Sequence, residues 1–385
     1  MKYVDEFRDH DKAKVLIREI AAVAAGIEIA AERPIQVMEV CGGHTHTIFR
    51  YGLAELLPKT IEFVHGPGCP VCVLPMGRID DCVAIAERPE VILATFGDAL
   101  RVPGSKKSLL QASADGADIR TVYSPMDALA LARANPDRQV VFFGLGFETT
   151  MPSTALTVLA AEAEGIDNFT VFCNHITIIP TMKAILESPD LQIDGFIGPG
   201  HVSIIIGTDP YGFIAEQYKR PLVVSGFEPL DVLQALWMVL LQIRDGRAEI
   251  ENQYGRLVGH AGNKVALSAI ERVYQPRDFF EWRGLGSIDQ SGVRFREAYA
   301  RFDAERRYTV PAVSIADPAA CQCGEVLKGL LKPRQCRIFG TACTPETPIG
   351  ALMVSSEGAC AAYYNYGRFR HPAPLAQEKL EAAHA

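Results

Sequence analysis

The 385-residue sequence lacks the features that would place it at a membrane or on a nucleic acid. Its strongest apolar run, residues 235–243, is far shorter than a transmembrane helix requires and is typical of a packed helix. The charged N-terminus has no apolar segment of the kind found in secretory signals. A formal net charge of −8 gives no excess of positive charge for a polyanion or an anionic membrane. We therefore expect a cytoplasmic protein with no nucleic-acid or membrane partner.

The sequence also lacks low-complexity segments, flexible linkers and the glycine motifs of nucleotide-binding proteins. The stretch "GLGFETT" (residues 144–150) bears only a faint likeness to a nucleotide loop, because it has neither the GxGxxG nor the P-loop form. We expect tightly packed domains with no phosphate-binding loop.

Short Val, Ile and Phe runs that end in glycine-rich polar turns do occur, and they recur eight times between residues 34 and 225. Such runs suit strands that are buried on both faces of a parallel sheet. Four units followed by four more predict an α/β fold with two tandem parallel-sheet domains, 34–125 and 126–225. Helical spacing in residues 1–33 and 226–305, and a loop-rich end, predict a helical, loop-rich third domain made of residues 1–33 with 226–385.

Ten cysteines need an explanation, because the cytoplasm keeps thiols reduced. Four lie in the first quarter of the chain and five within the last 65 residues. Clustering of this kind favours metal or redox chemistry over disulfide bonds. Cys82 is expected to be a buried core thiol, and Cys173 could serve either purpose.

The first cluster contains Cys41 in "EVCGGHTH" and the pair Cys69 and Cys72 in "GPGCPVC". Two adjacent glycines after Cys41 allow a turn or the close approach of a ligand. A helix that starts there would lower the pKa of the Cys41 thiol. Neighbouring histidines favour a metal or redox site over an isolated zinc half-site. The spacing does not distinguish zinc from iron.

Several polar turns follow strands in this pattern. In an open parallel sheet, ligands bind at the carboxyl ends of the strands. We therefore expect one cleft between the two domains to collect the side chains of Cys41, His44, Cys69, Cys72, Asp98, Glu148, Thr149, His175 and His201.

The second cluster holds five cysteines within 40 residues: Cys321, Cys323, Cys336, Cys343 and Cys360. Four thiolates are what a cubane iron–sulfur cluster requires. Zinc held by four cysteines is the structural alternative, although Cys-x-Cys is an uncommon zinc half-site. A fifth cysteine exceeds either requirement and indicates a redox partner thiol beside the metal.

Taken together, these stretches resemble the hydrogenase maturation protein family HypD. The similarity extends from residue 38 to residue 364 and rests on "EVCGGHTHTI", "HGPGCPVCV", "FGDALRVPG", "GFETT", "GPGHVS", "CQCGEVLKG", "FGTACTPETPIG" and "VSSEGACAAYY". The resemblance implies two related α/β domains and a third domain that holds a [4Fe-4S] cluster. It also implies a scaffold on which the Fe(CN)2CO moiety of [NiFe] hydrogenase is assembled with the chaperone HypC. Cyanide would come from the HypE–HypF pair, and the hydrogenase large subunit would be an indirect partner.

The resemblance also suggests roles for individual residues. Cys41, with His44 close by, would be an iron ligand, and Cys69 and Cys72 would be a redox dithiol or transient ligands. Asp98, Glu148 and His201 are further candidates for the catalytic site. The cluster ligands carried over from the family are Cys321, Cys336, Cys343 and Cys360, which leaves Cys323 as the extra thiol. Some members of the family have a second cysteine to pair with that thiol, where this chain has Leu352.

Two other interpretations stay open at this point. The chain could be a freestanding disulfide reductase that uses a cluster and a dithiol. It could also be a zinc-stabilised α/β binding protein without chemistry of its own.

Overall fold

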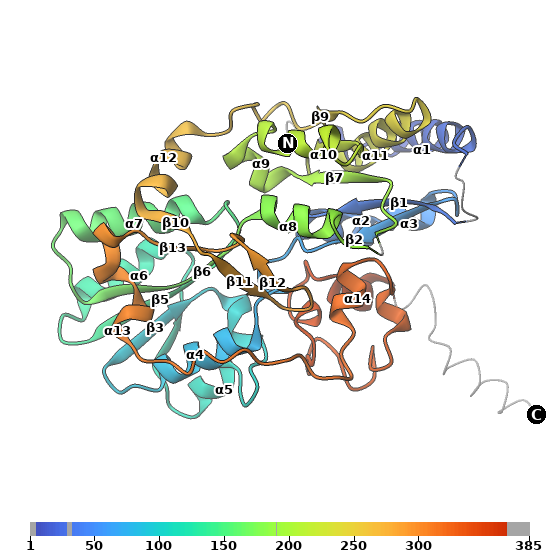
Figure 1. Ribbon diagram of the computed structural model, residues 1–385. Coiled ribbons are helices and arrows are strands. Elements are labelled where there is room, and N and C mark those ends of the chain that lie inside the picture. Colours follow the sequence, from blue (N-terminus) through green and yellow to red (C-terminus); the bar gives the residue numbers. More distant parts are fainter. Residues whose placement is uncertain (1–4, 29–32, 190, 368–385) are drawn as a thin grey trace, which may run out of the picture.

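The computed structural model describes residues 5–28, 33–189 and 191–367, and shows two parallel β-sheets covered by helices (Figure 1). Sheet A has the order β2 (Ile61–His65), β1 (Ile35–Glu39), β7 (Gly195–Pro199), β8 (Leu222–Ser225) and β9 (Ile250–Asn252). Sheet B has the order β4 (Ile119–Thr121), β3 (Val91–Thr95), β5 (Gln139–Gly146) and β6 (Phe169–His175). Every neighbouring pair in both sheets is parallel, which confirms the predicted α/β class.

All eight strands predicted from the apolar runs are present between residues 35 and 225. They are distributed between the sheets differently from the predicted division at residue 125. Residues 35–65 and 195–252 build sheet A, and the four strands of sheet B come from the intervening residues 91–175. Apolar rhythm identifies a buried strand, but it contains no information about which sheet the strand joins. Instead of the predicted tandem arrangement, the segment that forms sheet B is inserted between the two segments that form sheet A.

Helices cover the sheets and connect their strands. They are α2 (Gly42–Tyr51), α3 (Leu53–Leu56), α4 (Met76–Ala86), α5 (Leu109–Ala114), α6 (Pro125–Ala134), α7 (Met151–Ala163), α8 (Ile178–Leu186), α9 (Gly200–Ile206), α10 (Gly212–Glu216) and α12 (Lys264–Val273). A short 3₁₀ turn, Gly97–Arg101, follows β3. The two faces of sheet B bury alternate residues, with Ile92 and Phe142 on one side and Leu93 and Val141 on the other.

Two helices assigned from the sequence to the third domain belong to sheet A. The long helix α11 (Pro229–Arg244) packs on β7 and β8, and α1 (His10–Ala25) packs on α11. Ile20 and Val23 of α1 share one apolar core with Val37 of β1 and Leu233 of α11. The amphipathic pattern of α1 fits this position, because only its apolar stripe needs a partner.

The rest of the C-terminal region is less helical than the sequence predicts. Two antiparallel hairpins occupy residues 274–295, formed by β10 (Tyr274–Pro276) with β13 (Val293–Phe295) and by β11 (Phe279–Trp282) with β12 (Gly286–Asp289). Strands of three or four residues are too short to leave a clear alternation in the sequence. After α13 (Ala304–Arg307), residues 321–367 form a loop-rich unit with the short helices α14 (Cys323–Leu327) and α15 (Ala359–Ala362).

This loop-rich unit, drawn in red in Figure 1, lies beside β2, with which α14 is in contact. It therefore reaches the carboxyl ends of sheet A, where the first cysteine cluster lies. Within residues 5–28, 33–189 and 191–367, no helix is both long enough and apolar enough to cross a lipid bilayer.

Candidate thiol site between the sheets

Cys41 stands at the N-cap of α2, two residues after the end of β1. The loop that carries the two other thiols packs directly against it. A Cβ added to Gly68 would lie 2.4 Å from the Cα of Cys41, and the Gly42 N–H donates to the Gly68 carbonyl at 3.2 Å. Only glycine allows this approach of two backbones. The structure thus brings Cys41 and the Cys69–Cys72 loop together, as the strand-end argument predicts.

Cys69 and Cys72 form a buried pair of free thiols. The Cys72 Sγ donates to the Cys69 Sγ at a separation of 2.6 Å, which is longer than the ~2.05 Å of a disulfide bond. A Cβ on Gly358 would lie 2.9 Å from the Cys72 Sγ, so the "SSEGAC" segment of the loop-rich unit covers this thiol. Because the sulfur atoms are already adjacent, oxidation to a disulfide requires only a small movement.

The pKa of the Cys41 thiol differs from the sequence-based expectation. A helix does begin at Gly42, but burial raises the pKa of Cys41 well above its usual range, and the charge of Glu357 adds to the increase. The helix N-terminus is outweighed because the thiol is only 6% exposed. Cys41 is therefore protonated at neutral pH until a cation offsets the cost of its charge.

Two carboxylates that the sequence analysis did not select lie next to Cys41. Glu39, which is fully buried, accepts the Cys41 N–H at 3.0 Å, the Thr45 hydroxyl, and His65 Nδ1 at 2.7 Å. Glu357 packs on Gly42, where an added Cβ would lie 2.5 Å from the Glu357 Cβ. Burial raises the pKa of Glu357, with a contribution from Asp98.

Asp98 also lies near Glu357, because it accepts the hydroxyl of Ser355, two residues before Glu357, at 3.2 Å. Glu39, at the end of an apolar run, and Glu357, in the "SSEGAC" stretch, are both visible in the sequence. Nothing in the sequence showed that Glu39 and Glu357, which are 318 positions apart, would lie beside the same thiol.

Two of the three histidines of the predicted cleft, His44 and His201, differ in what they can offer Cys41. His44 is fully buried, its Nε2 lies 3.2 Å from the Ser225 carbonyl, and its Nδ1 has no partner among the described residues. His201 instead places Nδ1 4.0 Å from the Cys41 Sγ and is exposed on its other side. Burial lowers the pKa of His201 to about 4, so its ring is neutral at pH 7 and able to bind a metal.

The remaining predicted members of the cleft lie farther out. His175 is bound within sheet B by the hydroxyls of Thr150 and Thr154, at 3.4 and 3.2 Å. Thr149 makes no side-chain hydrogen bond to any residue that the structure describes. Glu148 is 6% exposed, and its Oε1 accepts the Ile178 N–H at 3.0 Å, while its Oε2 has no partner among the described residues.

The burial of Glu148 leads to a prediction about pH. Burial raises the pKa of Glu148 from 4.5 to about 7, so the folded protein holds this proton more tightly than the unfolded chain does. Stability should therefore fall as the pH rises from about 4.5 to 7, by about 3 kcal/mol for this group. Glu148→Gln keeps the acceptor for Ile178 and should remove that fall.

The measurement is the free energy of unfolding from urea titrations at pH 5 and pH 8. Glu216→Gln, at an exposed glutamate, is the control and should behave like the wild type. An equal loss between the two pH values in the wild type and in Glu148→Gln would contradict the assignment.

The five cysteines of the loop-rich unit line one small pocket together with Val326, Ile338, Phe339 and Met353. The Sγ atoms of Cys321 and Cys323 lie 3.0 Å apart. A Cβ on Gly350 would lie 2.5 Å from both of these sulfurs, so this glycine keeps the space beside them open. The charges of Cys343, Cys321 and Cys336 all contribute to raising the pKa of Cys360, after the effect of burial.

This donor set fits a cubane cluster better than a single ion. Within the described residues, no three His, Cys, Asp or Glu side chains close around one point as the ligands of a single metal ion do. A cubane requires a different arrangement, because each cysteine binds a different iron atom and the four sulfurs surround a volume. Cys321, Cys336, Cys343 and Cys360, together with Cys323, surround an apolar pocket, so enough thiols for a cubane are present.

Within the loop-rich unit of residues 321–367, which forms the tail of the described chain, Cys323 is the thiol that faces the first group of cysteines. Its charge contributes to raising the pKa of Cys72, after burial and the Cys69 thiol. Arg283 fixes the same junction. It is 3% exposed, its N–H donates to the Val73 carbonyl at 2.7 Å, and its guanidinium pairs with Asp317 at 2.5 Å. The thiols thus follow one another from Cys41 through Cys69 and Cys72 to Cys323.

Comparison with known proteins gives a family for this arrangement. The family model HypD, described as the hydrogenase formation hypA family, matches residues 11–367. The chain is 60% identical over 374 residues to the hydrogenase maturation factor HypD of Rhodobacter capsulatus, covering 96% of this chain and 99% of that protein. It is 57% identical over 366 residues to the factor of the same name from Escherichia coli strain K12, covering 95% and 98%. The chain belongs to the HypD family.

As a member of the HypD family, the chain belongs to a group of hydrogenase maturation factors. The position at which some HypD proteins are expected to have an additional cysteine is Leu352 here. It lies beside Cys323, and its backbone lowers the pKa of that thiol, against the larger effects of Cys321 and burial that raise it. In this HypD chain, the tail thiol therefore has no cysteine partner at that position.

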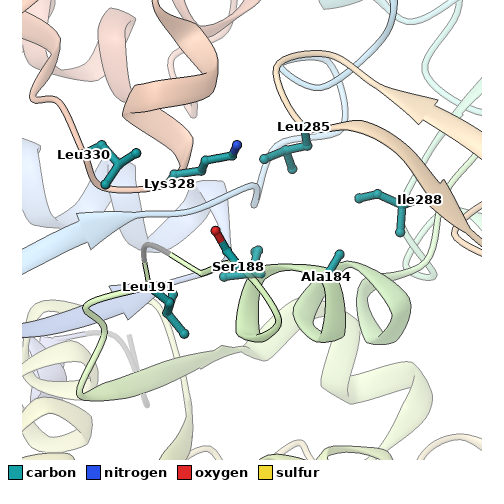
Figure 2. Close-up of a pocket in the computed structure, with 8 residues that line it drawn as sticks. Ala184, Ser188, Leu191, Leu285, Ile288, Lys328 and Leu330 are labelled. Atoms are coloured by element: carbon teal, nitrogen blue, oxygen red, sulfur yellow. The ribbon is translucent and has the colours of Figure 1, made fainter.

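A separate apolar pocket lies between α8, the β11–β12 hairpin and the segment after α14 (Figure 2). It is lined by Ala184, Ile185, Ser188, Leu191, Leu285, Ile288, Lys328 and Leu330. None of these residues belongs to either cysteine cluster, so this apolar pocket and the thiols occupy different places.

Proposed function

We propose that the protein is the scaffold and redox partner on which Fe(CN)2CO is assembled in the cytoplasm. HypC would be its partner during assembly, and HypE with HypF would supply the cyanide. The observation that carries this proposal is the order of the thiols. Cys41 lies against the Cys69–Cys72 loop, and the Cys72 thiol is within reach of the charge of Cys323.

Cys41 is the residue best placed to hold the iron that is the substrate. Thiolates are soft donors that suit iron, and His201 offers a neutral imidazole nitrogen on the exposed side of the same sulfur. The burial that raises the pKa of Cys41 makes thiolate formation depend on the arrival of a cation. Cys41 would therefore give up its proton when iron binds.

The tail residues Cys321, Cys336, Cys343 and Cys360 would hold a [4Fe-4S] cluster, which supplies single electrons when bound. Cys69 and Cys72 are close enough to form a disulfide, and its reduction to two thiols consumes two electrons and two protons. Cys323 lies between the tail pocket and Cys72, and Gly358 and Leu352 close the junction to water. This arrangement supports passage of electrons from the tail to the dithiol.

A freestanding disulfide reductase remains the alternative function. It would use Cys69, Cys72 and Cys323, but it would leave Cys41, His201 and the buried Glu39 without a task. The contacts around Cys41 favour the scaffold, because they place a thiol, a neutral imidazole and an exposed edge at the same point.

The test is an infrared spectrum of the anaerobically purified protein in complex with HypC. Cyanide and carbonyl stretching bands are the expected result. A brown protein with reducible Cys69 and Cys72 but no such bands would favour the reductase. A colourless protein that contains only zinc would overturn both functions.

A further inference from the structure

His201 has few contacts to fix its ring. Within the described residues, its side chain approaches Cys41 at 4.0 Å, and it makes no other hydrogen bond. Its side chain is exposed on one side, so an unsupported imidazole would be free to rotate away from the thiol. The position of its nitrogen over Cys41 therefore needs another cause.

Phe227, two residues after β8, supplies a flat surface at this position. The His201 ring stacks on it with centroids 3.8 Å apart and planes at 21°. The His44 ring also stacks on Phe227, at 4.8 Å and 22°. Two histidines of the predicted cleft, His44 and His201, are thus connected through one aromatic ring.

The phenyl ring is itself held firmly. The Thr47 hydroxyl donates to the Phe227 carbonyl at 2.6 Å, which anchors its backbone to α2. A Cβ on Gly43 would lie 2.7 Å from the ring, and a Cβ on Gly200 would lie 3.1 Å from it. Phe227 therefore contacts two glycines: Gly43, which precedes His44, and Gly200, which precedes His201. The space that these glycines leave is filled by this ring.

We propose that Phe227 is a positioning residue that holds the His201 imidazole beside the Cys41 sulfur. The ring acts through His201, on which it stacks. The inference rests on the proposed function only in so far as His201 assists Cys41 in holding iron. The stacking itself is independent of any cargo.

The main test compares Phe227→Leu with Phe227→Tyr by NMR of histidine-labelled protein, with His201→Gln used to assign the His201 resonances. Stacking places the His201 ring protons upfield in the wild type. They should stay there in Phe227→Tyr and move in Phe227→Leu to the position of the exposed His260, whose side chain is 84% accessible. Phe213→Leu, at another half-buried aromatic residue, is the matched control.

Unchanged His201 resonances in Phe227→Leu would overturn the proposal. If that variant does not fold, nuclear Overhauser contacts between the two rings in the wild type decide the question, and their absence overturns it. In the complex with HypC, Phe227→Leu should broaden the carbonyl band and weaken iron retention by about 2- to 10-fold, with rescue by Phe227→Tyr. Missing bands in the wild type would refute the iron scaffold and leave the NMR result standing.

Discussion

Replacing Cys41 by alanine should abolish the cyanide and carbonyl bands of the protein that is purified with HypC. Cys41 is the thiol that lies beside the His201 imidazole, with its Sγ 4.0 Å from His201 Nδ1. Its backbone is fixed by Glu39 and by the Gly68 contact. Loss of a ligand should exceed the 10–100-fold effect that is typical of an outer-shell change, which puts the bands below detection.

Cys82→Ala provides the matched control for this experiment. Cys82 is a fully buried thiol in α4, as the sequence predicts, and it lines neither cysteine site. Its removal should cost stability through lost packing but leave the bands at full intensity. Bands that persist in Cys41→Ala would show that the iron is held elsewhere.

Replacing Cys336 by serine should remove the brown colour and about four iron atoms per chain from the anaerobically purified protein. Cys336 lines the pocket of the loop-rich unit, and it is not among the groups that raise the pKa of Cys72, so its loss tests cluster binding. The measurements are the iron and sulfide content and the visible absorption. Cys173→Ser, at a buried thiol of β6, is the control and should keep the cluster.

Cys323→Ser completes the comparison. This variant should keep the colour, because four other cysteines surround the pocket, but it should lose reduction of the Cys69–Cys72 disulfide by dithionite. If Cys323→Ser is colourless and Cys321→Ser is brown, then Cys323 is the cluster ligand and Cys321 is the extra thiol.

The sequence was sufficient for the buried strands of the two parallel sheets, but not for their arrangement or for the short strands of residues 274–295. Eight buried strands follow from runs such as residues 140–143, because continuous apolar residues in a short segment have few other uses. Their division between two sheets depends on long-range packing of α1 and α11, which no local pattern encodes. The hairpins of residues 274–295 are too short to show a period.

The same limit applies to the site. Strand-end placement correctly predicted that Cys41 and the Cys69–Cys72 loop would meet. It could not show that His201 rather than His44 faces the sulfur, because ring direction depends on Ser225 and Phe227 from another part of sheet A. The raised pKa of Cys41 was also hidden, since burial depends on residues more than 300 positions later.

The insertion of sheet B into the chain of sheet A has a consequence during synthesis on the ribosome. Cys41, Cys69 and Cys72 are made early, whereas Phe227 and Glu357, which complete their surroundings, emerge much later. A nascent chain therefore carries three thiols before the residues that surround them in the fold have been made. Until then it depends on the reducing power of its surroundings to keep those thiols unoxidised.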